Sequence, residues 1–197
     1  MNNTKERILM VSLKLFAERG FDAVSTGIIA EKLGITKGAL YRHFRSKREI
    51  FDSIVERMYE YDSGRRWQDD LKPEGSAGVP GFAAYVLRQF DFWTEDEFAL
   101  CFRRMVSLEQ FKSPEMTKMY QDVIAMGPFK YLSFLISDMI KSGRMNKRAR
   151  DMGAPALALE LYSPLFLSIS LSDGGGNREK LKEDLIITVR GFQQRYS

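Results

Sequence analysis

The sequence predicts an all-α protein, and two observations lead to this fold class. Apolar residues recur every three or four positions in almost every segment, which is the spacing of one helix face. Glycines and capping residues separate these segments, and no alternating strand pattern of useful length lies between them. A length of 197 residues corresponds to one or two domains, which we place at residues 1–62 and 63–197.

Four helices are predicted in the first domain. A helix with its apolar face at residues 8–16 ends at Gly20, and a short second helix ends at Gly34. A third short helix follows that glycine. Ser46 and Glu49 then form a capping box, which predicts the start of a longer fourth helix.

The second domain is predicted to follow a linker at residues 69–81, which contains three glycines and two prolines. Helical spacing of apolar residues predicts helices at residues 82–93, 97–108, 114–141, 154–172 and 178–195. Thr94 and Glu97 predict a capping box between the first two. The pair Gly127-Pro128 is expected to kink or split the third.

Composition excludes several classes of protein. One cysteine and one histidine exclude a disulfide framework, a cysteine-rich metal site and a multi-histidine zinc site. The sequence shows no glycine-rich phosphate loop and no catalytic constellation, so we expect no enzyme activity, no cofactor and no metal. We recognise no signal peptide and no membrane span, and we therefore expect a cytoplasmic protein without a membrane partner.

The net charge of +4 is concentrated at the N-terminus. Residues 1–66 hold thirteen basic and nine acidic side chains, whereas the remaining residues hold seventeen of each. Residues 32–48 contain six basic side chains and no acidic one. Such a run is either a solvated charged face or a surface that attracts a polyanion, because clustered Lys and Arg neutralise phosphates.

Residues 25–47 favour the second of these readings. In the predicted third helix Leu40 and Phe44 take the core side, so Lys37, Tyr41 and their neighbours face outward together. An exposed face with an ammonium, a phenol and a guanidinium in a zone without acids is poorly explained by folding alone. Two short helices joined by a tight glycine turn form a helix-turn-helix, whose second helix enters the DNA major groove.

Residues 4–61 resemble the DNA-binding domain of TetR-type transcriptional regulators. The resemblance is carried by Ile8-Leu9 through Leu15-Phe16, Gly20-Phe21, Ile29-Ala30, Leu33-Gly34-Ile35, the run Lys37-Gly38-Ala39-Leu40-Tyr41-Arg42-His43-Phe44, and Lys47. It covers about a third of the chain, whereas the remainder matches only in its number of helices and its loops. The sequence departs from the family at Gly27, where some members carry a side chain that contacts bases.

The resemblance implies a set of DNA contacts from the second helix, the turn and the third helix. These residues are Thr26, Thr36, Lys37, Gly38, Ala39, Tyr41, Arg42, His43 and Lys47. Five of them have an alternative that is purely structural. Tyr41 could belong to the core, His43 could be a satisfied structural histidine, and Gly38 could be a relaxed surface glycine. Thr36 could only cap its helix, and Lys47 could be an exposed neighbour of the Ser46 cap.

The second domain is rich in Phe and Met, which suits either a core or a pocket for an apolar ligand. By analogy with the family, a small effector would bind a pocket lined by Phe90, Trp93, Phe102, Met105, Tyr120, Met126 and Phe129. Inward-facing carboxylates would favour a cationic ligand, and the candidates for these are Glu109, Asp122 and Glu160, although surface exposure is the more common fate of such residues.

The last two predicted helices suit a surface that binds a second subunit. In the resembling family the corresponding pair forms a four-helix interface. The residues proposed for it are Leu159, Ser163, Phe166, Leu181, Leu185, Val189 and Phe192. The alternative is an intramolecular core, because an apolar stripe has the same appearance in both cases.

Together these features predict a cytoplasmic homodimeric regulator of transcription. It would bind a palindromic operator in double-stranded DNA as a repressor and would leave it when a small hydrophobic effector binds. Two other classes stay open. One is a protein that binds nucleic acid without sequence preference, and the other is a helical carrier of small molecules.

Overall fold

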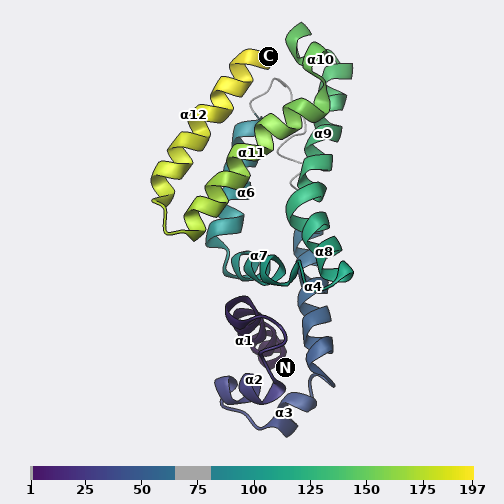
Figure 1. Cartoon of the computed structure of the whole chain (residues 1–197), viewed down its shortest axis with the longest axis vertical. Helices are drawn as coiled ribbons and strands as arrows, with labels where there is room; N and C mark the ends of the chain where they lie inside the picture. The colour runs from purple at the N-terminus through teal and green to yellow at the C-terminus, as the bar shows by residue number, and fades with distance from the viewer. Residues whose placement is uncertain (1, 65–80) are drawn as a thin grey trace. The chain divides into compact units, whose positions relative to one another are not determined.

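The computed structural model describes residues 2–64 and 81–197, and all regular structure in these ranges is helical (Figure 1). Contacts between residues divide the chain into two compact units. Unit 1 contains the residues up to the end of the fourth helix together with Glu97–Tyr120, and unit 2 contains the rest. Residues 69–80 of the predicted linker lie outside the described residues, and Gly81 begins a helix.

The described residues of unit 1 form six helices, labelled as in Figure 1. They are α1 (Asn2–Arg19), α2 (Thr26–Leu33), α3 (Lys37–Tyr41), α4 (Lys47–Gly64), α7 (Glu97–Glu109) and α8 (Pro114–Tyr120). The sequence predicts that the residues of α7 and α8 belong to the second domain. They join unit 1 because α7 packs along α1, a contact between segments far apart in the sequence. The domain boundary at residue 62 stays a prediction.

The core of unit 1 is formed by the apolar faces that the sequence predicts. Ile8, Leu13 and Phe16 of α1 and Ile50 and Ile54 of α4 are all completely buried, and the two helices pack against each other. Burial of an apolar side chain of this size stabilises a fold by about 1.5–3 kcal/mol. These contacts hold α1 and α4 together and leave α2 and α3 beside them as the helix-turn-helix.

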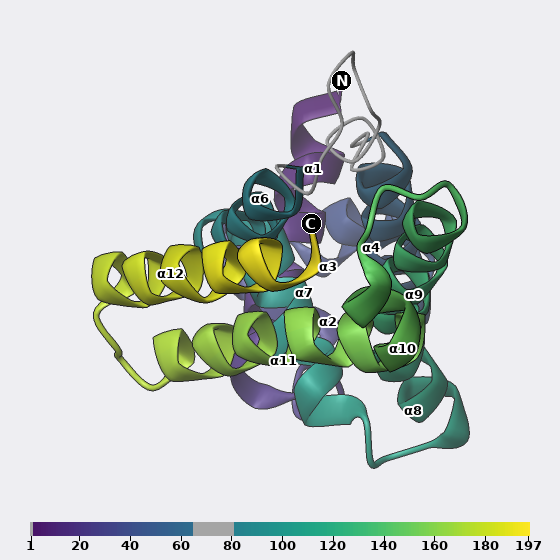
Figure 2. The same ribbon diagram turned by 90° about the horizontal axis from the view of Figure 1, so that it is seen from above.

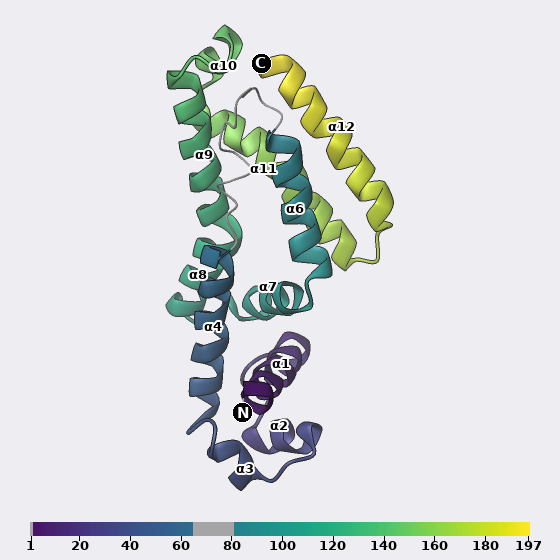
Figure 3. The same cartoon turned by 180° about the vertical axis from the view of Figure 1, so that it is seen from behind.

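Unit 2 is also entirely helical over its described residues. Its elements are α6 (Gly81–Glu95), the π-helical segment η1 (Gln121–Ala125), α9 (Met126–Lys141), α10 (Lys147–Met152), α11 (Ala154–Asp173) and α12 (Arg178–Tyr196). Helices α11 and α12 run antiparallel and lie side by side (Figure 2). Helix α6 contacts both of them, as the view from behind also shows (Figure 3).

The apolar stripe of α12 lies inside this unit. Leu185, Val189 and Phe192 are each 1% exposed. The Phe192 ring packs edge-on against Phe82 of α6, with 5.7 Å between ring centroids. These three residues, predicted from the sequence for a subunit interface, are therefore core residues of their own subunit. An amphipathic helix buries its apolar stripe wherever a complementary face is available, and here α6 supplies it.

Gly127-Pro128 breaks the helical pattern as predicted, and the structure gives the reason. Residues 121–125 widen into a π-helical turn before α9 begins. Pro128 has no N–H to donate to the carbonyl of Ile124, which is four residues earlier. The Tyr162 hydroxyl of α11 donates to this carbonyl instead. A methyl group at Gly127 would lie 1.8 Å from the Asp122 carbonyl oxygen, so only glycine fits.

The capping box predicted at Thr94 is wrong. Helix α6 continues through Thr94 to Glu95, and the Thr94 hydroxyl donates to the Phe90 carbonyl 2.7 Å away inside the helix.

Two helical stretches, Pro114–Lys141 and Ala154–Asp173, are long and apolar enough to cross a membrane. This is weak evidence for a span, because core helices of soluble proteins pass the same test.

Candidate nucleic-acid interface

The turn between α2 and α3 is fixed by local capping. The Ser25 hydroxyl accepts a hydrogen bond from the Ile28 N–H and caps α2. Gly34 ends α2 in the left-handed region at φ 68°, which a residue with a side chain rarely adopts. The Thr36 hydroxyl accepts from the Ala39 N–H at 3.1 Å and caps α3. The capping interpretation of Thr36 is therefore confirmed, and its DNA contact stays a prediction.

Helix α3 has the two faces that the sequence predicts. Leu40 and Phe44 are buried, whereas the Tyr41 side chain is 47% exposed, which rejects the core alternative for Tyr41. His43 is exposed as well. The other exposed residues around this helix are Thr36, Lys37, Gly38 and Arg42, while Ala39 is half-buried. This face carries no acidic side chain.

Gly38 leaves the middle of this face open. A methyl group at Gly38 would approach nothing more closely than the Thr36 hydroxyl, at 3.9 Å. Packing within the chain therefore does not require a glycine there, although glycine in a helix costs about 1 kcal/mol relative to alanine. A bare backbone suits a surface that a large partner approaches closely.

Both ends of α3 contact the first turn of α2. The Tyr41 hydroxyl lies 3.1 Å from the Thr26 hydroxyl, within hydrogen-bond distance. At the other end, the Lys37 side chain extends over Gly27, where a methyl group would lie 2.8 Å from Lys37 Cε. The first turn of α2 and the exposed face of α3 thus form one surface, which we call the α2–α3 face.

Lys47 is held by its own unit. Its ammonium donates to the Phe21 carbonyl oxygen at 2.7 Å and lies 4.1 Å from the centre of the Phe21 ring. The side chain is half-buried, so Lys47 is more than an exposed neighbour of the Ser46 cap. An ammonium has two further donors, and a phosphate contact from Lys47 stays a prediction.

The Phe21 peptide is also held from α7, by a carboxylate that is almost completely buried. Glu109 is 3% exposed, and its Oε1 accepts from the Phe21 N–H and from Lys112 Nζ, each at 2.9 Å. Lys112 donates in addition to Asp22 at 3.1 Å, and both acids raise its pKa, Glu109 more than Asp22. We call the group of Phe21, Asp22, Glu109 and Lys112 the Phe21 clamp. Glu109 is thus inward-facing but satisfied by its own chain.

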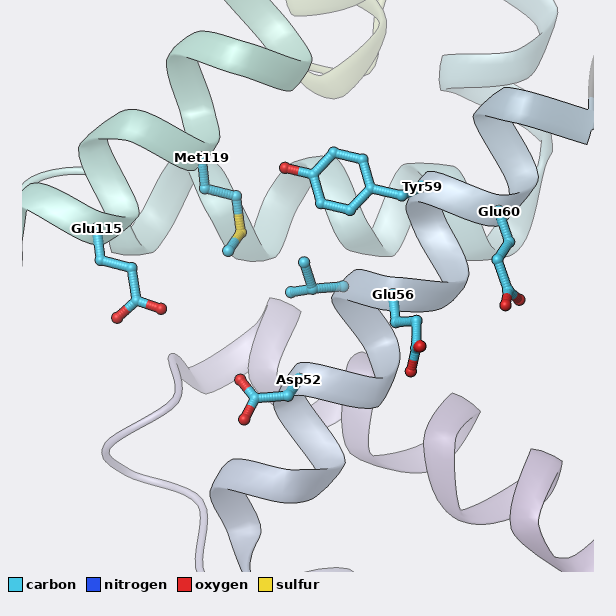
Figure 4. A pocket seen from close by; sticks show the side chains of 7 residues that line it. Asp52, Glu56, Tyr59, Glu60, Glu115 and Met119 are labelled. Atoms are coloured by element: carbon cyan, nitrogen blue, oxygen red, sulfur yellow. The ribbon is translucent and has the colours of Figure 1, made fainter.

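An open groove of about 870 Å³ lies between α4 and α8 in unit 1. Tyr59 extends from α4 toward Met119 of α8, and acidic side chains surround them (Figure 4). Arg48 pairs with two of these acids, Asp52 and Glu115, and thereby lowers the pKa of the Glu115 carboxyl. The negative surroundings make this groove unsuitable for phosphate and distinguish it from the α2–α3 face.

The seven residues predicted to line an effector pocket are divided between the two units. Phe102, Met105 and Tyr120 belong to unit 1, and the first two are completely buried. Unit 2 contains the others, of which Phe90 and Trp93 are buried, Phe129 is half-buried and Met126 is exposed. The α4–α8 groove is lined by none of the seven. Asp122 is exposed, and Glu160 pairs with Arg195 and Tyr196 of α12.

Helix α11 presents an apolar face to solvent. Leu159, Ser163 and Phe166, all predicted for the subunit interface, are exposed on it. Leu167 and Leu171 extend the exposed apolar surface along the helix. We call these five residues the α11 face. Leu181, the remaining predicted interface residue, is half-buried on α12.

Comparison with known proteins places these features in a family. Residues 8–54 match the family described as bacterial regulatory proteins, tetR family. The chain is 38% identical to the HTH-type transcriptional regulator AcrR of Shigella flexneri over 86 residues, which are 44% of this chain and 37% of that protein. It is 31% identical to the HTH-type transcriptional repressor KstR2 of Mycolicibacterium smegmatis over 134 residues, which are 62% and 64% of the two chains.

The fold comparison extends over nearly the whole chain. The structure of the ketosteroid transcriptional regulator KstR2 of Mycobacterium tuberculosis matches 97% of this chain and 95% of its own, with a TM-score of 0.67 and 18% identity. The sequence matches span less than two thirds of the length of the curated relatives. The matched residues contain α2, α3 and the turn between them, so residues 8–54 of this chain belong to the TetR family of bacterial regulatory proteins.

Proposed function

We propose that this protein is a sequence-specific DNA-binding regulator of transcription that acts in the cytoplasm as a homodimeric repressor. The observation that carries the proposal is the α2–α3 face, which is exposed, contains no acid and is held in one arrangement by the Thr26–Tyr41 contact. The family match supports the same function. The repressors among the relatives support the sign of regulation.

In this proposal α3 enters the major groove of DNA. Lys37 donates to base edges, because an ammonium pairs with the O6 and N7 acceptors of guanine. Tyr41, His43 and Thr26 contact phosphates and fix the position of the helix without reading sequence. Gly38 and Ala39 let the backbone approach the bases, and Arg42 and Lys47 add charge.

A selection of bound sites from random DNA, followed by band shifts on the selected site, tests this function. Changing Lys37 and Tyr41 together to alanine is expected to weaken specific binding at least about tenfold, because a base contact and a phosphate contact are both lost. The matched control changes Lys147 and Tyr59, which lie outside the α2–α3 face, and should bind as the unaltered protein does. Equal binding by both variants would exclude α3 as the reading helix.

The same selection separates the proposed function from two alternatives. A protein that binds nucleic acid without sequence preference would enrich no site and would show only a steep dependence on salt. A helical carrier would bind a small hydrophobic molecule with no change in DNA affinity. A repressor released by an effector would enrich one palindrome and lose it when the effector is added.

We also propose that the α11 face binds a second copy of the chain. Two α3 helices about 34–36 Å apart would then read both halves of a palindrome. Changing Phe166 to glutamate is expected to raise the dimer dissociation constant at least about 100-fold, because a charge would be buried at the centre of the interface. Phe134→Glu on α9 is the matched control, since Phe134 is also exposed but lies outside the α11 face. Light scattering measures the outcome, and a dimeric Phe166→Glu variant would contradict this assignment.

An effector would act by binding one arrangement of the dimer more tightly than the other. We propose a hydrophobic molecule as the effector, because the part of the chain after residue 81 is rich in Phe and Met. Release from DNA would follow if the arrangement that binds the effector holds the two α3 helices out of half-site register.

A further inference from the structure

We propose that Gly27 determines which base pair the protein reads, because it keeps open the place at the first turn of α2 in which the Lys37 side chain lies. This inference rests on the proposed DNA-binding function and adds a residue to it. Gly27 contacts no base in this view. It acts as a positioning residue for Lys37, the residue that does.

Contacts at Gly27 indicate that the Lys37 side chain lies in the space next to this glycine. A methyl group there would lie 2.8 Å from Lys37 Cε and 3.2 Å from Lys37 Nζ, both closer than ordinary van der Waals contact, so the flexible end of this exposed side chain would have to move away. Lys37 is the first residue of α3 and follows the Thr36 cap, so its side chain crosses from one helix to the other. The ammonium of α3 thereby occupies the space that a side chain from α2 would take.

The backbone at Gly27 does not itself require glycine. Five glycines among the described residues have a positive φ, and Gly27 is not one of them. It lies within α2, where alanine would favour the helix. Glycine at this position is therefore unexplained by local conformation, and the approach of Lys37 is the reason that the structure offers.

The C-terminal end of α3 also contacts the first turn of α2. Because the Tyr41 hydroxyl contacts Thr26, the first turn of α2 is held against both ends of α3. Lys37 then lies between the two helices, on the exposed α2–α3 face. From this place a single ammonium can donate to a base edge, and the major groove presents guanine O6 and N7 as acceptors.

The experiment is a double-mutant cycle on the full-length protein. Dissociation constants for the selected site and for unrelated DNA are measured at one salt concentration for Gly27→Ala, Lys37→Ala and the double variant. Gly27→Ala should lower specific affinity about tenfold, leave non-specific affinity unchanged because no charge is lost, and keep or raise the melting temperature. Gly191→Ala is the matched control, since Gly191 lies inside α12 in unit 2.

The double variant decides the outcome. If Gly27 acts through Lys37, the double variant binds the selected site as weakly as Lys37→Ala does and no more weakly. If the two losses multiply, or if Gly27→Ala binds normally, the assignment is overturned. Selection with the unaltered protein comes first, and failure to enrich any site would reject the proposed function and with it this inference. Enrichment followed by multiplied losses rejects the inference alone.

Discussion

Phe192→Ala is expected to lower the free energy of unfolding by about 3–5 kcal/mol, the range for removal of a fully buried aromatic ring. The Phe192 ring is 1% exposed and contacts two other rings, Phe82 at 5.7 Å and Tyr196 at 4.9 Å between centroids. Its loss would leave a cavity between α12 and α6. Urea denaturation followed by circular dichroism measures the change.

The same substitution separates a core from a subunit interface. A substitution in the core lowers stability by the same amount at every protein concentration, whereas a substitution at a subunit interface changes how stability depends on protein concentration. Ile187→Ala is the control on the same helix, because Ile187 is 65% exposed and its loss should cost less than about 1 kcal/mol. A Phe192→Ala variant that dissociates into stable monomers would place this ring at the interface after all.

The exposed face of α3 and the turn before it could be predicted from the sequence alone. The outward face of α3 followed from local information, because Leu40 and Phe44 at helical spacing determine what the remaining residues face. The left-handed turn at Gly34 was equally local. The partner of the apolar stripe on α12 could not be predicted from local information, since the same spacing of apolar residues indicates burial without indicating which surface covers them.

Three contacts could not be predicted from local signals in the sequence. Thr94 has the local signature of a cap, but α6 continues past it and buries its hydroxyl within the helix. The approach of Lys37 to Gly27 joins two helices across ten residues, and no motif encodes it. Glu109 was recognised only as one of several carboxylates that could face inward. Lys112 three residues later was the available signal of a local pair, but Phe21 lies 88 residues away.

Glu109→Ala is expected to lower the free energy of unfolding by about 2–3 kcal/mol. The substitution leaves the Phe21 N–H without its acceptor, leaves Lys112 with Asp22 alone, and empties a buried site. Glu109→Gln should lose about half as much, because an amide oxygen can still accept from the Phe21 N–H. Glu18→Ala is the control, since Glu18 is an exposed carboxylate of α1 and its loss should change stability by less than about 0.5 kcal/mol.

The pH dependence of the free energy of unfolding gives a second test of the role of Glu109. Glu109 and Asp22 raise the Lys112 pKa above its usual 10.5, so their stabilising effect is present at neutral pH. It is lost as the pH rises above 10.5 and through the raised pKa, because the folded state must then release a proton that the unfolded state has already released. Glu109→Gln should therefore flatten the alkaline fall in stability. An unchanged alkaline profile, with full stability in Glu109→Ala, would mean that the Phe21 clamp does not hold α7 to the turn that precedes α2.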